Sequence, residues 1–235
     1  MEYITLNNGI KMPMLGYGVY QVTKDECKRC VLDALETGYR LIDTAQSYFN
    51  EEKVGQALAE SGIPRRDIFL TTKVWVEHYG YEETKKSVYI SLEKLKTEYL
   101  DLMLLHQPFA DYYGAYRALE DLYTEGVIRA IGVSNFYPDR LVDIANFARI
   151  VPMVNQVETH PLNQQTEAMK WMKKYDVQIE AWAPFGEGRG GLFENDVLAA
   201  IGKKYNKTAA QVMLRWNLQR GVVVLLSLIH ISEPT

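Results

Sequence analysis

The sequence predicts an α/β protein built as a TIM-type (β/α)8 barrel. Short apolar runs alternate with longer helical patterns at a spacing of roughly thirty residues, which is typical of repeated parallel βαβ units. The runs are apolar almost throughout, so the sheet they form is expected to be covered on both faces. No glycine-rich G-x-G-x-x-G turn follows the 39–42 run, which disfavours a doubly wound sheet that binds a dinucleotide.

Composition fits one large soluble domain. The chain has 235 residues, of which 47% are hydrophobic and 24% charged. A net charge of -4 provides no basic surface for nucleic acid and no polybasic membrane anchor. The first residues do not resemble a secretory signal, and no apolar run reaches the ~18 residues of a membrane span. We expect a cytoplasmic protein without nucleic-acid or membrane partners.

The elements follow in order from an amino-terminal β-hairpin. Residues 3–6 and 10–12 flank a turn at Asn7-Asn8-Gly9. A capping box, Thr23 with Glu26, begins a helix that ends at Gly38. Strands and helices then alternate over residues 39–42, 50–61, 68–72, 82–98, 100–105, 112–125, 128–133, 138–148, 153–157, 164–175 and 177–181. A glycine-rich loop over 184–191, two helical stretches and a strand over 222–225 follow.

Cys27 and Cys30 form a C-x-x-C pair within the first helical pattern. With Val31, Ala34 and Leu35 they occupy positions i, i+3, i+4, i+7 and i+8, the spacing of a buried helix stripe. A redox dithiol would instead follow a strand, and a zinc site would need two more ligands nearby. We therefore expect both cysteines to face the core.

Polar and aromatic side chains stand where the predicted strands end. In a parallel barrel these ends share one rim, where active sites lie. The rim set consists of Asp43, Lys73, His106, Ser134, Asn135, Gln156 and Trp182, with Tyr48 on the first loop. Any one of them could be a helix cap or a solvated charge, but the set combines an acid, an amine, a phenol and an imidazole.

These groups suit the protonation of a carbonyl oxygen. A free phenol has a pKa near ~10 and is a poor acid at neutral pH. A lysine ammonium lowers the pKa of a nearby phenol, and a carboxylate keeps that lysine charged and oriented. Tyr48 is then the general acid, Lys73 its modulator and Asp43 the anchor of Lys73. His106 would orient the carbonyl. The carbonyl carbon also needs a hydride, which implies a nicotinamide cofactor.

Several motifs resemble those of the aldo-keto reductase family over residues 2–224. They are Gly38-Tyr39-Arg40-Leu41-Ile42-Asp43-Thr44-Ala45, Thr72-Lys73-Val74-Trp75, Asp101-Leu102-Met103-Leu104-Leu105-His106, Gly132-Val133-Ser134-Asn135-Phe136, Asn155-Gln156-Val157-Glu158 and Ala181-Trp182-Ala183-Pro184. The resemblance implies a (β/α)8 enzyme that reduces aldehydes and ketones to alcohols with NADPH, NADH being possible. The family's catalytic tetrad falls on Asp43, Tyr48, Lys73 and His106.

The resemblance also implies the binding residues. Cofactor contacts are expected from Gly18, Val19, Tyr20, Asp43, Ser134, Asn135, Gln156, Trp182, Ala183, Phe185 and Glu187. Substrate contacts are expected from Tyr20, Tyr48, Trp75, His106 and Gln107, and no metal site is expected. Within the family the short loops are similar to the bacterial branch, which includes 2,5-diketo-gluconate and methylglyoxal reductases. A small carbonyl compound is the expected partner of a monomer.

The end of the chain departs from the family pattern. Residues 1–224 are assigned to the barrel, and residues 225–235 to a tail that lacks the family's expected Ile-Pro-Lys-Ser type segment. Seven strands are counted, so we expect an incomplete barrel without its eighth strand and final helix. Strands 39–42 and 222–225 would then expose unpaired edges. We accordingly expect this chain to aggregate or express poorly and to bind NADPH weakly, the reductase function being that of the intact parent protein.

Two other functions fit the same barrel. His160 and Glu158 suggest a metal-dependent hydrolase, but such an enzyme would want H-x-H after the 39–42 strand, where Asp43-Thr44-Ala45 stands. A non-catalytic nicotinamide-binding protein of this fold is the other alternative. NADPH-dependent reduction of an aldehyde distinguishes all three.

Overall fold

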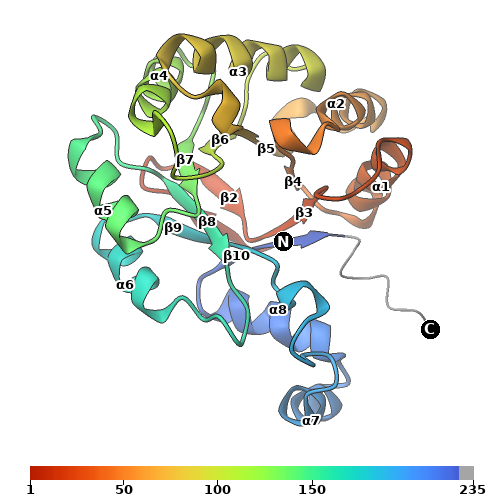
Figure 1. Ribbon diagram of the computed structural model, residues 1–235. Coiled ribbons are helices and arrows are strands. Elements are labelled where there is room, and N and C mark those ends of the chain that lie inside the picture. Colours follow the sequence, from red (N-terminus) through yellow and green to blue (C-terminus); the bar gives the residue numbers. More distant parts are fainter. Residues whose placement is uncertain (228–235) are drawn as a thin grey trace.

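The computed structural model describes residues 1–227, and within them eight parallel strands close into a barrel (Figure 1). The order around the barrel is β10-β3-β4-β5-β6-β7-β8-β9. Their bounds are β3 Leu15–Gly18, β4 Leu41–Asp43, β5 Phe69–Val74, β6 Leu102–Leu105, β7 Ile131–Ser134, β8 Val154–Glu158, β9 Gln178–Trp182 and β10 Val223–Ser227. The predicted (β/α)8 architecture is confirmed.

Helices surround the barrel and connect its strands (Figure 1). They are α1 Lys24–Thr37, α2 Glu51–Glu60, α3 Tyr81–Leu95, α4 Tyr112–Thr124, α5 Pro138–Phe147, α6 Thr166–Lys174, α7 Asp196–Tyr205 and α8 Ala209–Gln219. Short 3-10 turns occur at η1 Gln46–Tyr48, η2 Arg65–Asp67, η3 Val76–His78 and η4 Gly186–Gly188. Thr23 caps α1, which ends at Gly38 in the left-handed conformation with φ 110°. None of the helices within residues 1–227 has the length and apolar character to cross a bilayer.

The expectation of an incomplete barrel is wrong. Residues 15–18 were not predicted as a strand, because two of the four are glycines, which are rare in strands. They form β3, which pairs with β4 on one side and β10 on the other. Both edges that were expected to be open are therefore paired. The expected aggregation loses the open strand edges on which it depended, and weak NADPH binding stays a prediction.

The predicted tail, residues 225–235, lies partly within the described residues. Leu225, Leu226 and Ser227 belong to β10 and pair with Gly16, Tyr17 and Gly18 of β3. The remaining predicted tail residues, 228–235, lie outside the described residues. The first residues of the tail thus help to close the barrel.

Close packing explains the glycine at position 16. A Cβ built there would lie 2.5 Å from Cγ and Cδ2 of Leu41 and 2.8 Å from Cδ2 of Leu225. Both leucines are buried, at 0% and 5% exposure. The glycine that weakens the strand signal in the sequence is thus required by the packing of the neighbouring strands.

We expect Gly16→Ala to lower the free energy of unfolding by about 1–3 kcal/mol, because two buried leucines must move to admit the methyl group. Gly18→Ala is the matched control on the same strand, since its nearest neighbour, Leu226 O, is 3.5 Å away. Denaturant unfolding of the three proteins measures the effect. Equal losses at both positions would contradict this account.

The amino-terminal hairpin covers the end of the barrel opposite the predicted rim. Its strands are β1 Tyr3–Thr5 and β2 Lys11–Pro13. Asn7 and Asn8 in the turn donate hydrogen bonds to the carbonyl oxygens of Pro152, Asp176 and Arg129, in the segments that precede β8, β9 and β7. This closure leaves the carboxyl ends of the strands as the accessible end.

The first helix confirms the prediction for the cysteines. Cys27 and Cys30 are free and buried, at 0% and 5% exposure, on the side of α1 that faces the core. Burial raises the pKa of both thiols, the Cys27 thiol to about 12. Neither cysteine is therefore a reactive thiolate at neutral pH.

Candidate active site

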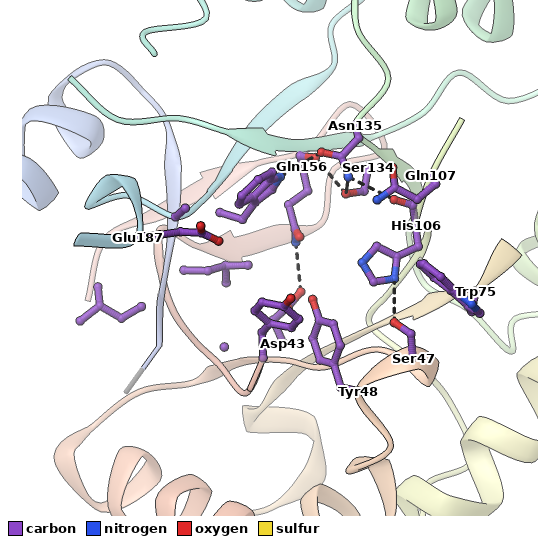
Figure 2. A pocket seen from close by; sticks show the side chains of 16 residues that line it. Asp43, Ser47, Tyr48, Trp75, His106, Gln107, Ser134, Asn135, Gln156 and Glu187 are labelled. Carbon is purple, nitrogen blue, oxygen red and sulfur yellow. Dashed lines mark hydrogen bonds between the residues drawn. The ribbon is translucent and has the colours of Figure 1, made fainter. Parts of the chain in front are cut away.

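A cavity of about 440 Å³ opens at the carboxyl ends of the barrel strands (Figure 2). Most of the predicted site residues line it: Gly18, Tyr20, Asp43, Tyr48, Trp75, His106, Gln107, Ser134, Asn135, Gln156, Trp182, Ala183 and Glu187. Three predicted residues, Val19, Lys73 and Phe185, do not line it. Three lining residues, Ser47, Leu225 and Leu226, were not predicted.

Lys73 lies beneath the cavity floor and is fully buried. Its Nζ donates to Asp43 Oδ1 at 2.5 Å and to the Thr44 carbonyl oxygen at 2.9 Å. The Tyr48 hydroxyl is 3.4 Å from the same ammonium. The predicted acid, amine and phenol thus form one connected group, in which Lys73 touches both partners.

Burial and the contacts within this group act on its ionisation in opposite directions. Burial lowers the pKa of Lys73, but Asp43 and Tyr48 outweigh that effect and hold the pKa above its ordinary value. Burial raises the pKa of Tyr48 to about 12, although Lys73 acts to lower it. The expectation that Lys73 brings the phenol below its ordinary pKa is therefore not met in this structure. Lys73 reduces a rise that burial would otherwise make larger.

His106 lines the cavity beside Tyr48 and Trp75. The ring lies edge-on to Tyr48 and Trp75, with centroids 5.7 and 5.2 Å away. Its Nδ1 is 3.3 Å from Ser47 Oγ. Burial, and then the charge of Lys73, lower the pKa of His106 to about 3. The imidazole is consequently neutral at physiological pH.

The loop that carries Tyr48 is anchored by buried amides. Gln46 donates to Ser91 Oγ at 3.1 Å, and its side-chain oxygen accepts from the Trp75 N–H at 2.9 Å. Asn50 donates to the Val19 carbonyl oxygen at 2.9 Å. The Val19 N–H in turn donates to the Asp43 carbonyl oxygen at 3.0 Å. Val19, which is fully buried, therefore supports the site through its backbone.

The far wall presents an aromatic ring and amides. The Trp182 indole N–H donates to Asn135 Oδ1 at 3.0 Å, and Asn135 Nδ2 donates to the His106 carbonyl oxygen at 3.2 Å. Ser134 Oγ donates to the Gln156 carbonyl oxygen at 3.0 Å. Asn135 and Ala183 have positive φ angles of 63° and 47°. Such strained backbone is concentrated at functional sites.

Gln156 joins the floor to a second buried acid that was not predicted. Its Nε2 donates to Asp43 Oδ2 at 3.0 Å and to Glu180 Oε2 at 2.8 Å (Figure 2 shows the Asp43 bond). Both N–H groups are thereby committed, which leaves the amide oxygen as the group Gln156 can offer to a bound molecule. Burial first, and then the Asp43 charge, raise the pKa of the fully buried Glu180 to about 8.

The loop after β9 holds the remaining predicted residues. Phe185 is 1% exposed and packs with Leu192, Leu198 and Met213, so its contribution is structural support of the loop. Glu187 lines the cavity and forms an ion pair with Arg189 at 2.9 Å.

The residues that suggested a hydrolase form a local contact. His160 Nε2 is 3.3 Å from Glu158 Oε1, and its Nδ1 accepts from the Leu162 N–H at 3.3 Å. Within residues 1–227, no three histidine, cysteine, aspartate or glutamate side chains converge into a metal-ligating group.

This rim chemistry, on a closed parallel barrel, belongs to oxidoreductases that act on carbonyl groups. Comparison with known proteins gives the family: the model of the Aldo/keto reductase family matches residues 12–233, and the chain belongs to it. The match continues past residue 224, so a tail outside the family is not shown.

Individual relatives and solved structures support the same family assignment. The chain is 48% identical to the glyoxal reductase of Bacillus subtilis over 226 residues, covering 95% of this chain and 81% of that protein. It is 39% identical to the methylglyoxal reductase DkgA of Escherichia coli K12, over 94% of this chain and 81% of that protein. An aldo-keto reductase of Bombyx mori in complex with NADP is 31% identical with a TM-score of 0.92, over 96% of this chain and 83% of that one.

Proposed function

We propose that the protein reduces aldehydes and ketones to alcohols with NADPH. The observation that carries this proposal is the position of the Lys73 ammonium, which contacts Asp43 and Tyr48 directly beneath a cavity that His106 faces. A protonated phenol supported by a cation suits the donation of a proton to a carbonyl oxygen.

Each member of the tetrad has a distinct role. Tyr48 donates its proton to the carbonyl oxygen, and Lys73 stabilises the phenolate that remains. Asp43 keeps Lys73 charged and in place. The neutral His106 donates a hydrogen bond that orients the carbonyl. When bound, NADPH supplies the hydride for the carbonyl carbon, which completes the alcohol.

The cavity has groups suited to the cofactor. The Trp182 ring is proposed to stack on the nicotinamide, with the Gln156 amide oxygen, Ser134 and Asn135 facing its carboxamide. The proposed contacts continue along Gly18, Tyr20, Asp43, Ala183 and Glu187, and Val19 and Phe185, whose side chains do not line the cavity, are proposed to contribute through their backbone. The NADP complex of the Bombyx mori relative supports NADPH over NADH.

Small 2-oxoaldehydes are the first substrates to test, because relatives at 48% and 39% identity are named glyoxal and methylglyoxal reductases. Tyr20, Trp75 and Gln107, which line the cavity with Tyr48 and His106, are proposed to flank the substrate. The monomeric state and the cytoplasmic location stay predictions.

The test follows the loss of NADPH absorbance with methylglyoxal or glyoxal, with and without a metal chelator. Turnover that survives the chelator is expected. Hydrolytic activity that needs added metal and no nicotinamide would favour the hydrolase. NADPH binding without turnover of any aldehyde would favour a non-catalytic binding protein.

A further inference from the structure

We infer that Ser47 is a positioning residue that sets which nitrogen of the His106 ring carries the proton. Ser47 Oγ lies 3.3 Å from His106 Nδ1, and both side chains line the cavity. Figure 2 shows this contact, with the other ring nitrogen, Nε2, directed toward the interior of the cavity. The kinetic consequence of the inference rests on the proposed reduction, whereas the placement of the proton does not.

The role of His106 requires one particular tautomer. A neutral imidazole has one N–H donor and one lone pair. A carbonyl oxygen only accepts hydrogen bonds, so the nitrogen that faces the cavity must carry the proton. Nδ1 must then be the acceptor, and it needs a donor of its own.

The Ser47 hydroxyl is suited to be that donor. Within residues 1–227 its hydroxyl has no hydrogen-bonding partner other than His106, so its proton is available to Nδ1. The Ser47 contact therefore favours the tautomer that carries its proton on Nε2.

Both partners of this contact are held in place by other groups. Ser47 lies in η1, next to Gln46, which is bonded to the Ser91 hydroxyl and the Trp75 backbone. The His106 ring is held by the edge-on rings of Tyr48 and Trp75. Removing the Ser47 hydroxyl is consequently expected to change the hydrogen bond without moving the loop.

Nitrogen-15 NMR of the ligand-free protein labelled at histidine tests the inference directly. The chemical shifts of Nδ1 and Nε2 report which nitrogen is protonated, and His106→Gln identifies the His106 signals by their loss. In the unsubstituted protein and in Ser47→Thr, which keeps a hydroxyl, we expect the proton on Nε2. In Ser47→Ala we expect a mixture of tautomers. A proton on Nδ1 in the unsubstituted protein, or unchanged shifts in Ser47→Ala, would overturn the inference.

Kinetics separate this inference from the proposed function. With methylglyoxal and NADPH, Ser47→Ala is expected to lower kcat about threefold to tenfold, the loss of one hydrogen bond. The dissociation constant for NADPH should stay unchanged, and Ser47→Thr should restore most of the rate. Absence of reductase activity in every variant refutes the proposed function and leaves the NMR result to decide the role of Ser47. An unchanged kcat in Ser47→Ala, with a shifted tautomer, refutes the catalytic consequence alone.

Discussion

Tyr48→Phe is expected to lower kcat for carbonyl reduction by about a hundredfold to ten-thousandfold, the usual contribution of a general acid. The substitution removes only the hydroxyl that lies 3.4 Å from Lys73 Nζ. Lys73 keeps its bonds to Asp43 and to the Thr44 carbonyl oxygen, so the floor of the site is retained. The dissociation constant for NADPH and the melting temperature should change little. Steady-state kinetics measure the loss of kcat, and a thermal melt measures the melting temperature.

Tyr39→Phe is the matched control for this prediction. It removes the same atom from another partly buried tyrosine, which packs edge-on against Tyr17 at a ring distance of 6.0 Å and does not line the cavity. It should retain kcat. A Tyr48→Phe enzyme with nearly full kcat would show that another group donates the proton.

Glu180→Gln is expected to stabilise the protein at alkaline pH. The ordinary pKa of a glutamate is 4.5, and burial with the Asp43 charge raises that of Glu180 to about 8 in the folded protein. Between these values the folded state keeps a proton that the unfolded state releases, so stability falls as pH rises. Each pH unit corresponds to about 1.4 kcal/mol, which gives a total of order a few kcal/mol. Glutamine resembles the protonated acid and avoids this loss.

Thermal melts from pH 5 to pH 9 measure this difference. We expect the melting temperature of Glu180→Gln to exceed that of the unsubstituted protein by several degrees, about 2–4 °C per kcal/mol, at the alkaline end and to differ little near pH 5. Glu36→Gln, on the exposed face of α1, is the control and should show no such trend. A constant difference across the pH range would mean that Glu180 does not titrate as described.

Much of the fold is predictable from the sequence because parallel strands and their helices have distinct apolar periods. β5 and α4 lie within one or two residues of their predicted bounds. β3 cannot be recognised from its local sequence, because the reason for its glycine is a contact with residues far along the chain. Gly16 is unfavourable for a strand by local propensity, and only the side chains of Leu41 and Leu225 explain it. The error in one strand produced the wrong conclusion that the barrel is open.

The site was predictable where chemistry follows strand ends. Asp43, Lys73 and His106 converge at the carboxyl ends of the strands, but Lys73 is buried beneath the cavity and the pKa of Tyr48 lies above its ordinary value. Glu180 carries a sequence signal, because it stands two residues before Trp182 and alternation along a strand places both on the same face. Ser47 had no such signal. Its contact with His106 joins two separate loops and is visible only in three dimensions.

The pairing of β10 with β3 also bears on how the chain folds. It joins the two ends of the described sequence, so it is among the contacts with the greatest separation along the chain. Contacts of this kind form slowly, because the intervening chain must first be ordered. While the protein is being synthesised, the edge of β3 that pairs with β10 is expected to stay unpaired until β10 has left the ribosome. Chaperones that shield exposed strand edges would therefore act on β3 and β9 during this interval, before the barrel closes.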